Sequence, residues 1–163
     1  MLAVSRFDRA RIVGEAAADH LGAIQAAMVH SLRLRLNRRA IISTSADLLG
    51  YLGADMKNLL HERFRVLFLT TRNELMADDL VWEGTAGEAP AYPREIVKRA
   101  LEVGATGLIL VHNHPSGSHK PSQGDIDATR RIAEAASMLG ICLHDHLVIS
   151  RAGWFSFRTM GLI

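Results

Sequence analysis

The stretch that decides the fold is His112-Asn113-His114-Pro115-Ser116-Gly117, which directly follows the apolar run Gly107-Leu108-Ile109-Leu110-Val111. Because this run is short and begins with glycine, it predicts a buried β-strand. Side chains two positions apart on a strand point to the same face, so His112 and His114 should lie together. Pro115 favours an extended backbone at His114, which keeps the pair on one face at the end of the strand.

Asp125 completes a candidate metal site with these histidines, because the loop before it can fold back toward the strand end. Two imidazole nitrogens and one carboxylate oxygen leave the fourth position of a zinc ion open for water, as in catalytic zinc sites. Ser122 and Asp125 also fit an ordinary helix start, with serine as the N-cap and an acid at the third helical position. Each feature alone is most simply structural, but their occurrence within one short loop favours a metal site.

The spacing His112-x-His114-Pro115 followed by Ser122-x-x-Asp125 resembles the JAMM motif of MPN-domain metalloproteases. Further matches narrow the resemblance to the bacterial RadC-like proteins: HNHPSG at residues 112–117, WEGT at 82–85, PREI at 93–96 and LHDHLV at 143–148. The resemblance covers roughly residues 43–163. It implies an α/β fold of the MPN type, in which helices flank a curved mixed β-sheet.

The same resemblance implies the chemistry of the site. His112, His114 and Asp125 would bind one Zn²⁺ ion per chain, with water as the fourth ligand. Glu62 would be the general base, because the family places its catalytic glutamate on the corresponding strand, and Ser122 would help to stabilise the developing oxyanion. The implied reaction is hydrolysis of an amide bond, peptide or isopeptide, in a protein or peptide substrate.

The residues themselves say less about Glu62 than the resemblance does. Residues 62–69 predict a strand on which Phe64, Val66 and Phe68 share a face with Glu62. An acid at the end of such an apolar row is most simply a strand end that points to solvent. The sequence alone slightly favours that explanation, whereas the resemblance favours the general base.

Other histidines offer alternatives to this site. His144 and His146 lie on a predicted strand at residues 142–150, and their spacing places them on one face as a second candidate metal site. No third ligand follows at a recognisable spacing, so this site is the weaker one. Asp145 lies between the two histidines, and the resemblance instead suggests that an Asp-His pair on this strand lies near the active site and supports the first site by hydrogen bonding. His119 could compete for the metal or contact the substrate.

Length and composition set the class of protein. A chain of 163 residues with 48% apolar and 22% charged residues predicts one globular domain with a substantial core. The apolar runs are too short to span a bilayer, so no membrane association is expected, and the N-terminus lacks a secretory pattern; we therefore expect a cytoplasmic protein. Cys142 is the only cysteine, which rules out an internal disulfide, and its apolar neighbours predict a core position.

Residues 1–42 form a separate N-terminal helical segment ahead of the domain at 43–163. The pattern predicts a helix over residues 14–36, with a stripe made of Ala18, Leu21, Ile24, Ala27 and Met28. RadC-like proteins often carry helix-hairpin-helix motifs before the catalytic domain. This segment is too short for the complete module, so we expect a truncated remnant.

Four arginines lie at the end of the predicted helix, namely Arg33, Arg35, Arg38 and Arg39. Cations suit the last turn of a helix, and we favour this explanation over a phosphate-contacting patch because no aromatic residues lie between them. The net charge of +2 is also too small to indicate a nucleic-acid binder, so we expect weak or no binding of nucleic acid. The second functional hypothesis is a non-catalytic, DNA-repair-associated module that binds DNA or protein.

The other predicted elements complete the MPN-like order. Helices are expected from an N-cap within residues 43–47 through Leu52, over 93–101, and from Ser122 to Leu139; returning strands are expected over 74–82 and 154–158. The last helix should bury a stripe formed by Ile126, Ile132, Ala133, Ala136 and Leu139.

Overall fold

The computed structural model describes residues 6–36, 45–84 and 92–163 of the chain. Within these ranges the helices are α1 (Arg6–Val13), α2 (Glu15–Leu36), α3 (Ala46–Met56), α4 (Pro93–Val103) and α5 (Gln123–Ser137). The strands are β1 (Glu62–Leu69), β2 (Leu75–Gly84), β3 (Gly107–Asn113), β4 (Cys142–Ser150) and β5 (Gly153–Ser156). The expected boundary between residues 42 and 43 lies outside the described residues, as do Arg38, Arg39 and Thr85.

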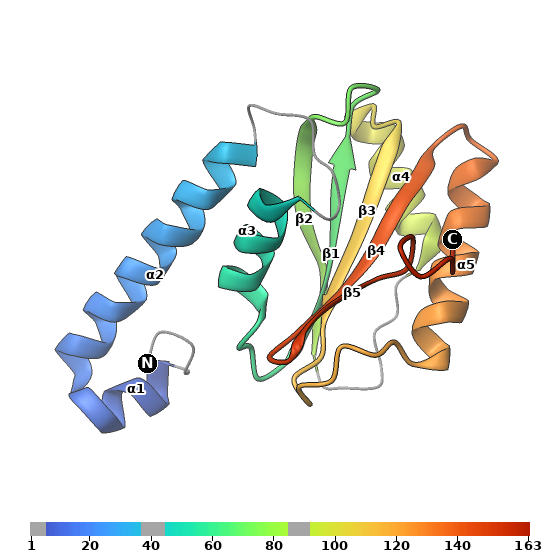
Figure 1. Cartoon of the computed structure of the whole chain (residues 1–163). Coiled ribbons are helices and arrows are strands. Elements are labelled where there is room, and N and C mark those ends of the chain that lie inside the picture. Colours follow the sequence, from blue (N-terminus) through green and yellow to red (C-terminus); the bar gives the residue numbers. More distant parts are fainter. Residues whose placement is uncertain (1–5, 37–44, 85–91) are drawn as a thin grey trace.

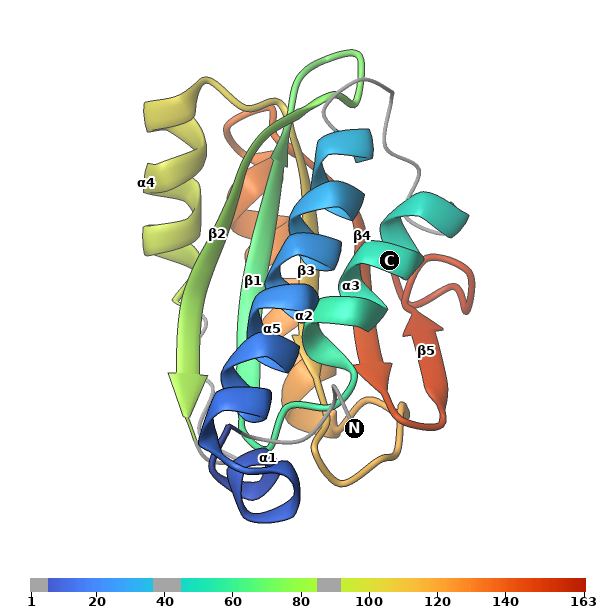
Figure 2. The same cartoon turned by 90° about the vertical axis from the view of Figure 1, so that its left-hand side faces the viewer.

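The strands form one mixed sheet in the order β2-β1-β3-β4-β5. Only the central pair, β3 and β4, is parallel, and α5 connects these two strands; the other neighbours are antiparallel. Figure 1 shows α2 and α3 on one side of this sheet and α4 and α5 on the other, and Figure 2 shows the side that α2 and α3 cover. The predicted α/β class, a mixed sheet flanked by helices, is confirmed.

Both faces of the sheet are buried, which explains why the central strands are almost continuously apolar. Every residue of β3 is buried. The face toward α4 and α5 contributes Phe64, Val66, Phe68, Leu108 and Leu110 to one core, together with Ile96 and Ile132 of the helices. The opposite face contributes Leu67, Leu69, Ile109 and Val111 to a second core beneath α3 and the end of α2. The alternation predicted for residues 62–69 therefore holds.

The predicted helix at residues 14–36 is present as α2, but its predicted apolar stripe is not a core stripe. Ala18 is buried, whereas Ile24 and Met28 are 56% and 48% exposed. Figure 1 shows the N-terminal part of α2 leaning away from the sheet, next to α1. These side chains are exposed because only the last turns of α2 reach α3 and the sheet.

Two predicted core residues are at the surface. Leu139 is 52% exposed because α5 ends at Ser137, before the turn at Gly140. Cys142 is exposed because it is the first residue of β4, paired with Gly107 at the end of the ladder. None of the helices that the structure describes combines the length and the hydropathy needed to cross a membrane.

Candidate metal centre

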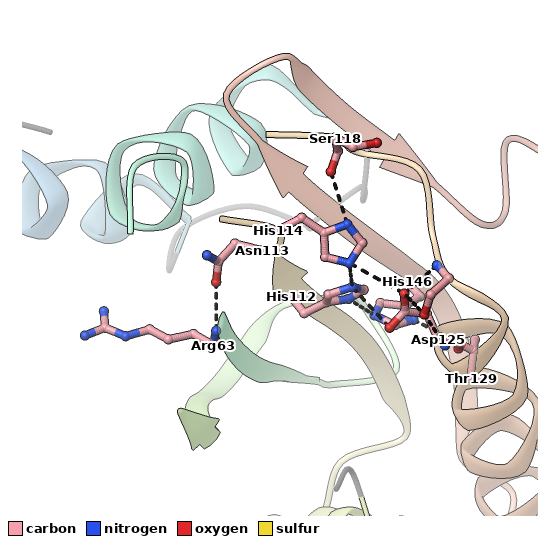
Figure 3. Close-up of polar contacts among 9 residues, drawn as sticks. Arg63, His112, Asn113, His114, Ser118, Asp125, Thr129 and His146 are labelled. Carbon is pink, nitrogen blue, oxygen red and sulfur yellow. Dashed lines mark hydrogen bonds and ion pairs between the residues drawn. The ribbon is translucent and has the colours of Figure 1, made fainter. Parts of the chain in front are cut away.

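The C-terminal end of β3 and the first turn of α5 bring together the three predicted ligands (Figure 3). The Nε2 atom of His112 lies 2.9 Å from Nε2 of His114 and 3.3 Å from Oδ1 of Asp125. The Nε2 atom of His114 lies 3.5 Å from Oδ2 of Asp125. His112 is 4% exposed and the other two are half-buried, so the group lies at a partly open edge of the core.

Asp125 is oriented by the start of α5, as the predicted capping box requires. The Ser122 hydroxyl accepts a hydrogen bond from the backbone N–H of Asp125, and Oδ2 of Asp125 accepts one from the backbone N–H of Ser122. The hydroxyl also donates to Oδ2 at 2.7 Å. The helix start therefore holds both the carboxylate and Ser122 beside the histidines.

The second ring nitrogen of His112 begins a hydrogen-bonded chain that ends on the backbone of α5. His112 Nδ1 lies 2.8 Å from Nε2 of His146, whose Nδ1 lies 2.6 Å from the Thr129 hydroxyl. That hydroxyl donates its single hydrogen to the carbonyl of Asp125, so it must accept from Nδ1 of His146. Burial lowers the pKa of His146 and keeps its ring neutral, so Nε2 of His146 accepts from Nδ1 of His112.

The protonation of His114 is also determined by a hydrogen bond of its Nδ1 atom, the ring nitrogen that points away from Asp125. Its Nδ1 lies 3.1 Å from the backbone carbonyl of Ser118, which can only accept, so this nitrogen carries the proton. Both Nε2 atoms therefore present lone pairs toward each other and toward the carboxylate of Asp125. Three electron-pair donors at these distances repel one another unless a cation lies between them, and two nitrogens and one oxygen are a donor set that suits zinc.

The charges of the site agree with this arrangement. When no cation lies between the three groups, protons on the Nε2 atoms can take its place: the hydrogen bond that His114 then makes to Asp125 raises the pKa of His114 above its ordinary value, and the nearby Glu62 carboxylate adds to that effect. Burial alone would raise the pKa of Asp125, but the hydrogen bonds that protonated His112 and His114 donate outweigh it and hold this pKa far below its ordinary value. The carboxylate is therefore ionised and attracts positive charge to this point.

Glu62 lies on the same face of the sheet as the three ligands. It is the first residue of β1, and it precedes by two positions Phe64, which pairs with His112. Its side chain is half-buried rather than fully solvated. The expectation that Glu62 ends an apolar row is confirmed, and the row leads to the candidate metal ligands.

The second predicted histidine pair is not formed. A β-bulge in β4 pairs Leu108 with Leu143 but Ile109 with Asp145, so His144 is left out of the ladder. His146 faces His112, whereas His144 lies over Gly107 and beside Cys142. The two rings therefore cannot share a metal ion, and the prediction that they are co-facial is wrong.

His119 is outside the metal centre as well. Its ring lies against Gly153, the first residue of β5. Among the described residues, only His112, His114 and Asp125 converge as potential metal ligands.

A family model described as a RadC-like JAB domain matches residues 42–162. The chain belongs to this family. A UPF0758 protein from Rhodobacter capsulatus is 48% identical over 151 residues, which is 93% of this chain and 71% of that protein. A UPF0758 protein from Ruegeria pomeroyi is 44% identical over 160 residues, which is 98% of this chain and 71% of that protein.

Within this RadC-like JAB domain, Thr129 was not predicted from the sequence, whereas Asp145 belongs to the Asp-His pair that was expected to support the site. Thr129 lies four residues after Asp125, a spacing that places both on one face of a helix and could have identified it. Asp145 is fully buried, and its carboxylate accepts from the Ser156 hydroxyl at 2.6 Å and from the backbone N–H of Arg158 at 3.0 Å. It therefore fixes the chain after β5 against β4, directly beside His146.

Proposed function

We propose that this chain is a zinc-dependent hydrolase that cleaves an amide bond, peptide or isopeptide, in a protein or peptide substrate. The observation that supports it most is the convergence of three lone-pair donors, from His112, His114 and Asp125, at one point. A zinc ion at this point would act as a Lewis acid and lower the pKa of a water molecule toward neutrality. Membership of the JAB family is compatible with this chemistry.

Two side chains of the domain would serve the reaction without binding the metal. Glu62 would take the proton of the attacking water and pass it to the leaving amine. Ser122 would donate its hydroxyl hydrogen to the oxyanion that develops on the substrate, in place of the bond that it makes to Asp125. The hydroxyl can do so and still accept from the N–H of the helix, because it has one donor and two acceptor sites.

Glu62→Gln is the variant that tests this proposal. Glutamine keeps the shape of the side chain and can still hydrogen-bond water, but it cannot take up the proton. We expect full zinc content, an unchanged fold, and a rate of peptide hydrolysis lower by about a hundredfold to ten-thousandfold.

The measurement is a digest of a diverse peptide library by the zinc-loaded protein, followed by kinetics on any peptide that is cleaved. His119→Ala is a matched control, because His119 lies in the same loop region but outside the metal centre. Equal hydrolysis by wild type and Glu62→Gln, with full zinc in both, would remove Glu62 from the mechanism.

A DNA-repair-associated binding module remains the second hypothesis, and the described residues support it less. Arg33 and Arg35 are exposed near the end of α2 and would provide only a small basic patch. We expect at most weak, non-specific binding, with each phosphate contact adding roughly one unit to the salt slope. Tight binding of duplex DNA at physiological salt would contradict this expectation. We also propose a cytoplasmic location, since a single cysteine is typical of proteins without structural disulfides.

A further inference from the structure

We propose that Asn113 is a positioning residue that holds Glu62 at the metal centre, by supplying the hydrogen-bond donor that Pro115 lacks. This inference rests on the proposed role of Glu62. Asn113 lies between the two histidine ligands, and its side chain points to the opposite face of β3 from theirs. None of the roles described above requires it to be asparagine.

The register of the sheet defines the gap that Asn113 fills. The β1–β3 ladder ends with Phe64 opposite His112, so its continuation places Glu62 opposite His114. The backbone N–H of His114 donates to Ile149 of β4 at 2.9 Å, and therefore points away from β1. Glu62 and His114 thus occupy a non-hydrogen-bonded position, whose flanking bonds would join His61 to residue 115 and Arg63 to residue 113.

One of these flanking bonds cannot form between backbones. The carbonyl of His61 needs a donor from residue 115, and Pro115 has no N–H. The Asn113 side chain supplies the missing donor: its Nδ2 donates to the His61 carbonyl at 3.0 Å. Its Oδ1 accepts from the backbone N–H of Arg63 at 2.8 Å, as Figure 3 shows. The peptide groups before and after Glu62 are therefore both bonded to one side chain.

Only an amide of this length satisfies both partners. The N–H of Arg63 can only donate and the carbonyl of His61 can only accept, so the orientation of the Asn113 amide is fixed by its neighbours. Aspartate would keep the acceptor and lose the donor, and alanine would lose both. Asn113 is 1% exposed, so water cannot easily replace a lost bond.

The two hydrogen bonds of the Asn113 side chain fix the backbone around Glu62 rather than the fold as a whole. On its other side the start of β1 still pairs with β2, where Glu62 lies opposite Gly84. Loss of the Asn113 bonds should therefore leave the sheet intact but free the backbone of Glu62 on the side that faces the metal ligands. Because a general base works only within hydrogen-bond reach of its proton, this freedom should weaken its action on the attacking water.

Amide hydrogen exchange of Arg63, measured by NMR, tests the geometry without any substrate. We expect the Arg63 amide to be protected in the wild type and to exchange on the order of tenfold faster in Asn113→Ala. Asn113→Asp keeps the acceptor and should retain part of the protection. Ser150→Ala is the control, because Ser150 is also buried at a strand end but bonds only within its own turn. Unchanged protection of Arg63 in Asn113→Ala would overturn the proposal.

Cobalt-substituted protein tests the consequence for Glu62. The pH midpoint of its visible absorption should shift in Glu62→Gln, and Asn113→Ala should shift it in the same direction with unchanged metal content. The double variant should behave as Glu62→Gln alone. A shift in Glu62→Gln but none in Asn113→Ala would overturn the positioning role. Absence of a shift in Glu62→Gln itself would instead contradict the proposed function, and Arg63 exchange would then decide on the positioning alone.

Discussion

Asp125 shows how one residue joins the helix start to the metal centre. Its carboxylate closes the capping box with Ser122 and also faces His112 and His114. A negative charge in the first turn is favoured by the helix dipole, so folding of α5 helps to keep this carboxylate ionised. Its backbone carbonyl receives the hydrogen bond of Thr129, which connects the same residue to the far nitrogen of His112. The start of α5 therefore orients two of the three candidate ligands.

Thr129→Val should weaken zinc binding although Thr129 does not contact the metal position. Valine keeps the size of the side chain but cannot accept a hydrogen bond from Nδ1 of His146. The His146 proton is then no longer held on Nδ1, so Nε2 of His146 need not accept from Nδ1 of His112. Loss of such an outer hydrogen bond typically costs tenfold to a hundredfold in metal affinity. Thr129→Ser should restore most of the affinity. Competition with a zinc chelator measures both variants, and equal affinity of Thr129→Val and wild type would contradict the hydrogen-bonded chain.

At the residue scale, the sequence predicted which candidate ligands come together better than it predicted the side chains that support them. The spacing of His112, His114 and Asp125 was sufficient, because strand and helix periodicities determine where these side chains point. His146 was expected to be co-facial with His144, and the bulge in β4 reverses this. A bulge depends on packing between strands that are distant in sequence, so local alternation cannot reveal it.

At the element scale, a buried ionic network joins α3 to the sheet on the face opposite the metal centre. The hydroxyl of Tyr51 donates to Asp78 at 2.5 Å and accepts from Arg65 at 2.8 Å. Arg65 also pairs with Asp78 at 2.7 Å and with Asp55. The alternation of residues 62–69 placed Arg65 on this face, but its partners come from α3 and β2 and were not predictable from strand periodicity.

Tyr51→Phe should therefore destabilise the fold without changing zinc affinity. It removes the donor to Oδ2 of the buried Asp78 carboxylate, which then keeps only the bonds from Arg65 to Oδ1, at a cost of roughly 1 to 3 kcal/mol. Burial, and next the charge of Asp78, raise the pKa of Tyr51, so the folded state favours the protonated phenol. The contribution of the Tyr51 hydroxyl to the free energy of unfolding is complete below the pKa of about 10 that tyrosine has in the unfolded chain, and it declines as pH rises above that value. The difference in unfolding free energy between wild type and variant should shrink accordingly.

Urea unfolding at neutral pH and above pH 10 measures this difference. Tyr92→Phe is the matched control, because the sequence contains two tyrosines and Tyr92 is 54% exposed. A Tyr51→Phe variant that is as stable as the wild type at neutral pH would show that the Tyr51 hydroxyl contributes nothing to stability.

On the scale of the whole molecule, the metal centre lies where one core meets solvent. The core toward α4 and α5 contains Phe64 and Leu110, and His112 continues the same face of β3 at the sheet end. The order of elements in this domain was predictable from hydrophobic periodicity and turn residues. The packing of α2 was not, because an apolar stripe does not show whether a partner covers it within the chain.

Zinc should bind at about one ion per chain and stabilise the whole fold. An excess of a thousandfold over the dissociation constant gives about 4 kcal/mol, or a rise in Tm of roughly 10 °C for a chain of this size. Binding requires that the Nε2 atoms of both histidines carry no proton. Because the pKa of His114 is raised, a proton competes there at higher pH than at an ordinary histidine. The rise in Tm should be largest above that pKa and shrink as pH falls through it.

Thermal unfolding with zinc and with a chelator, at several pH values, measures this rise in Tm. A His112→Ala, His114→Ala double variant should show no rise, and His119→Ala should respond as the wild type does. Stoichiometric zinc in the double variant would contradict the assigned ligands.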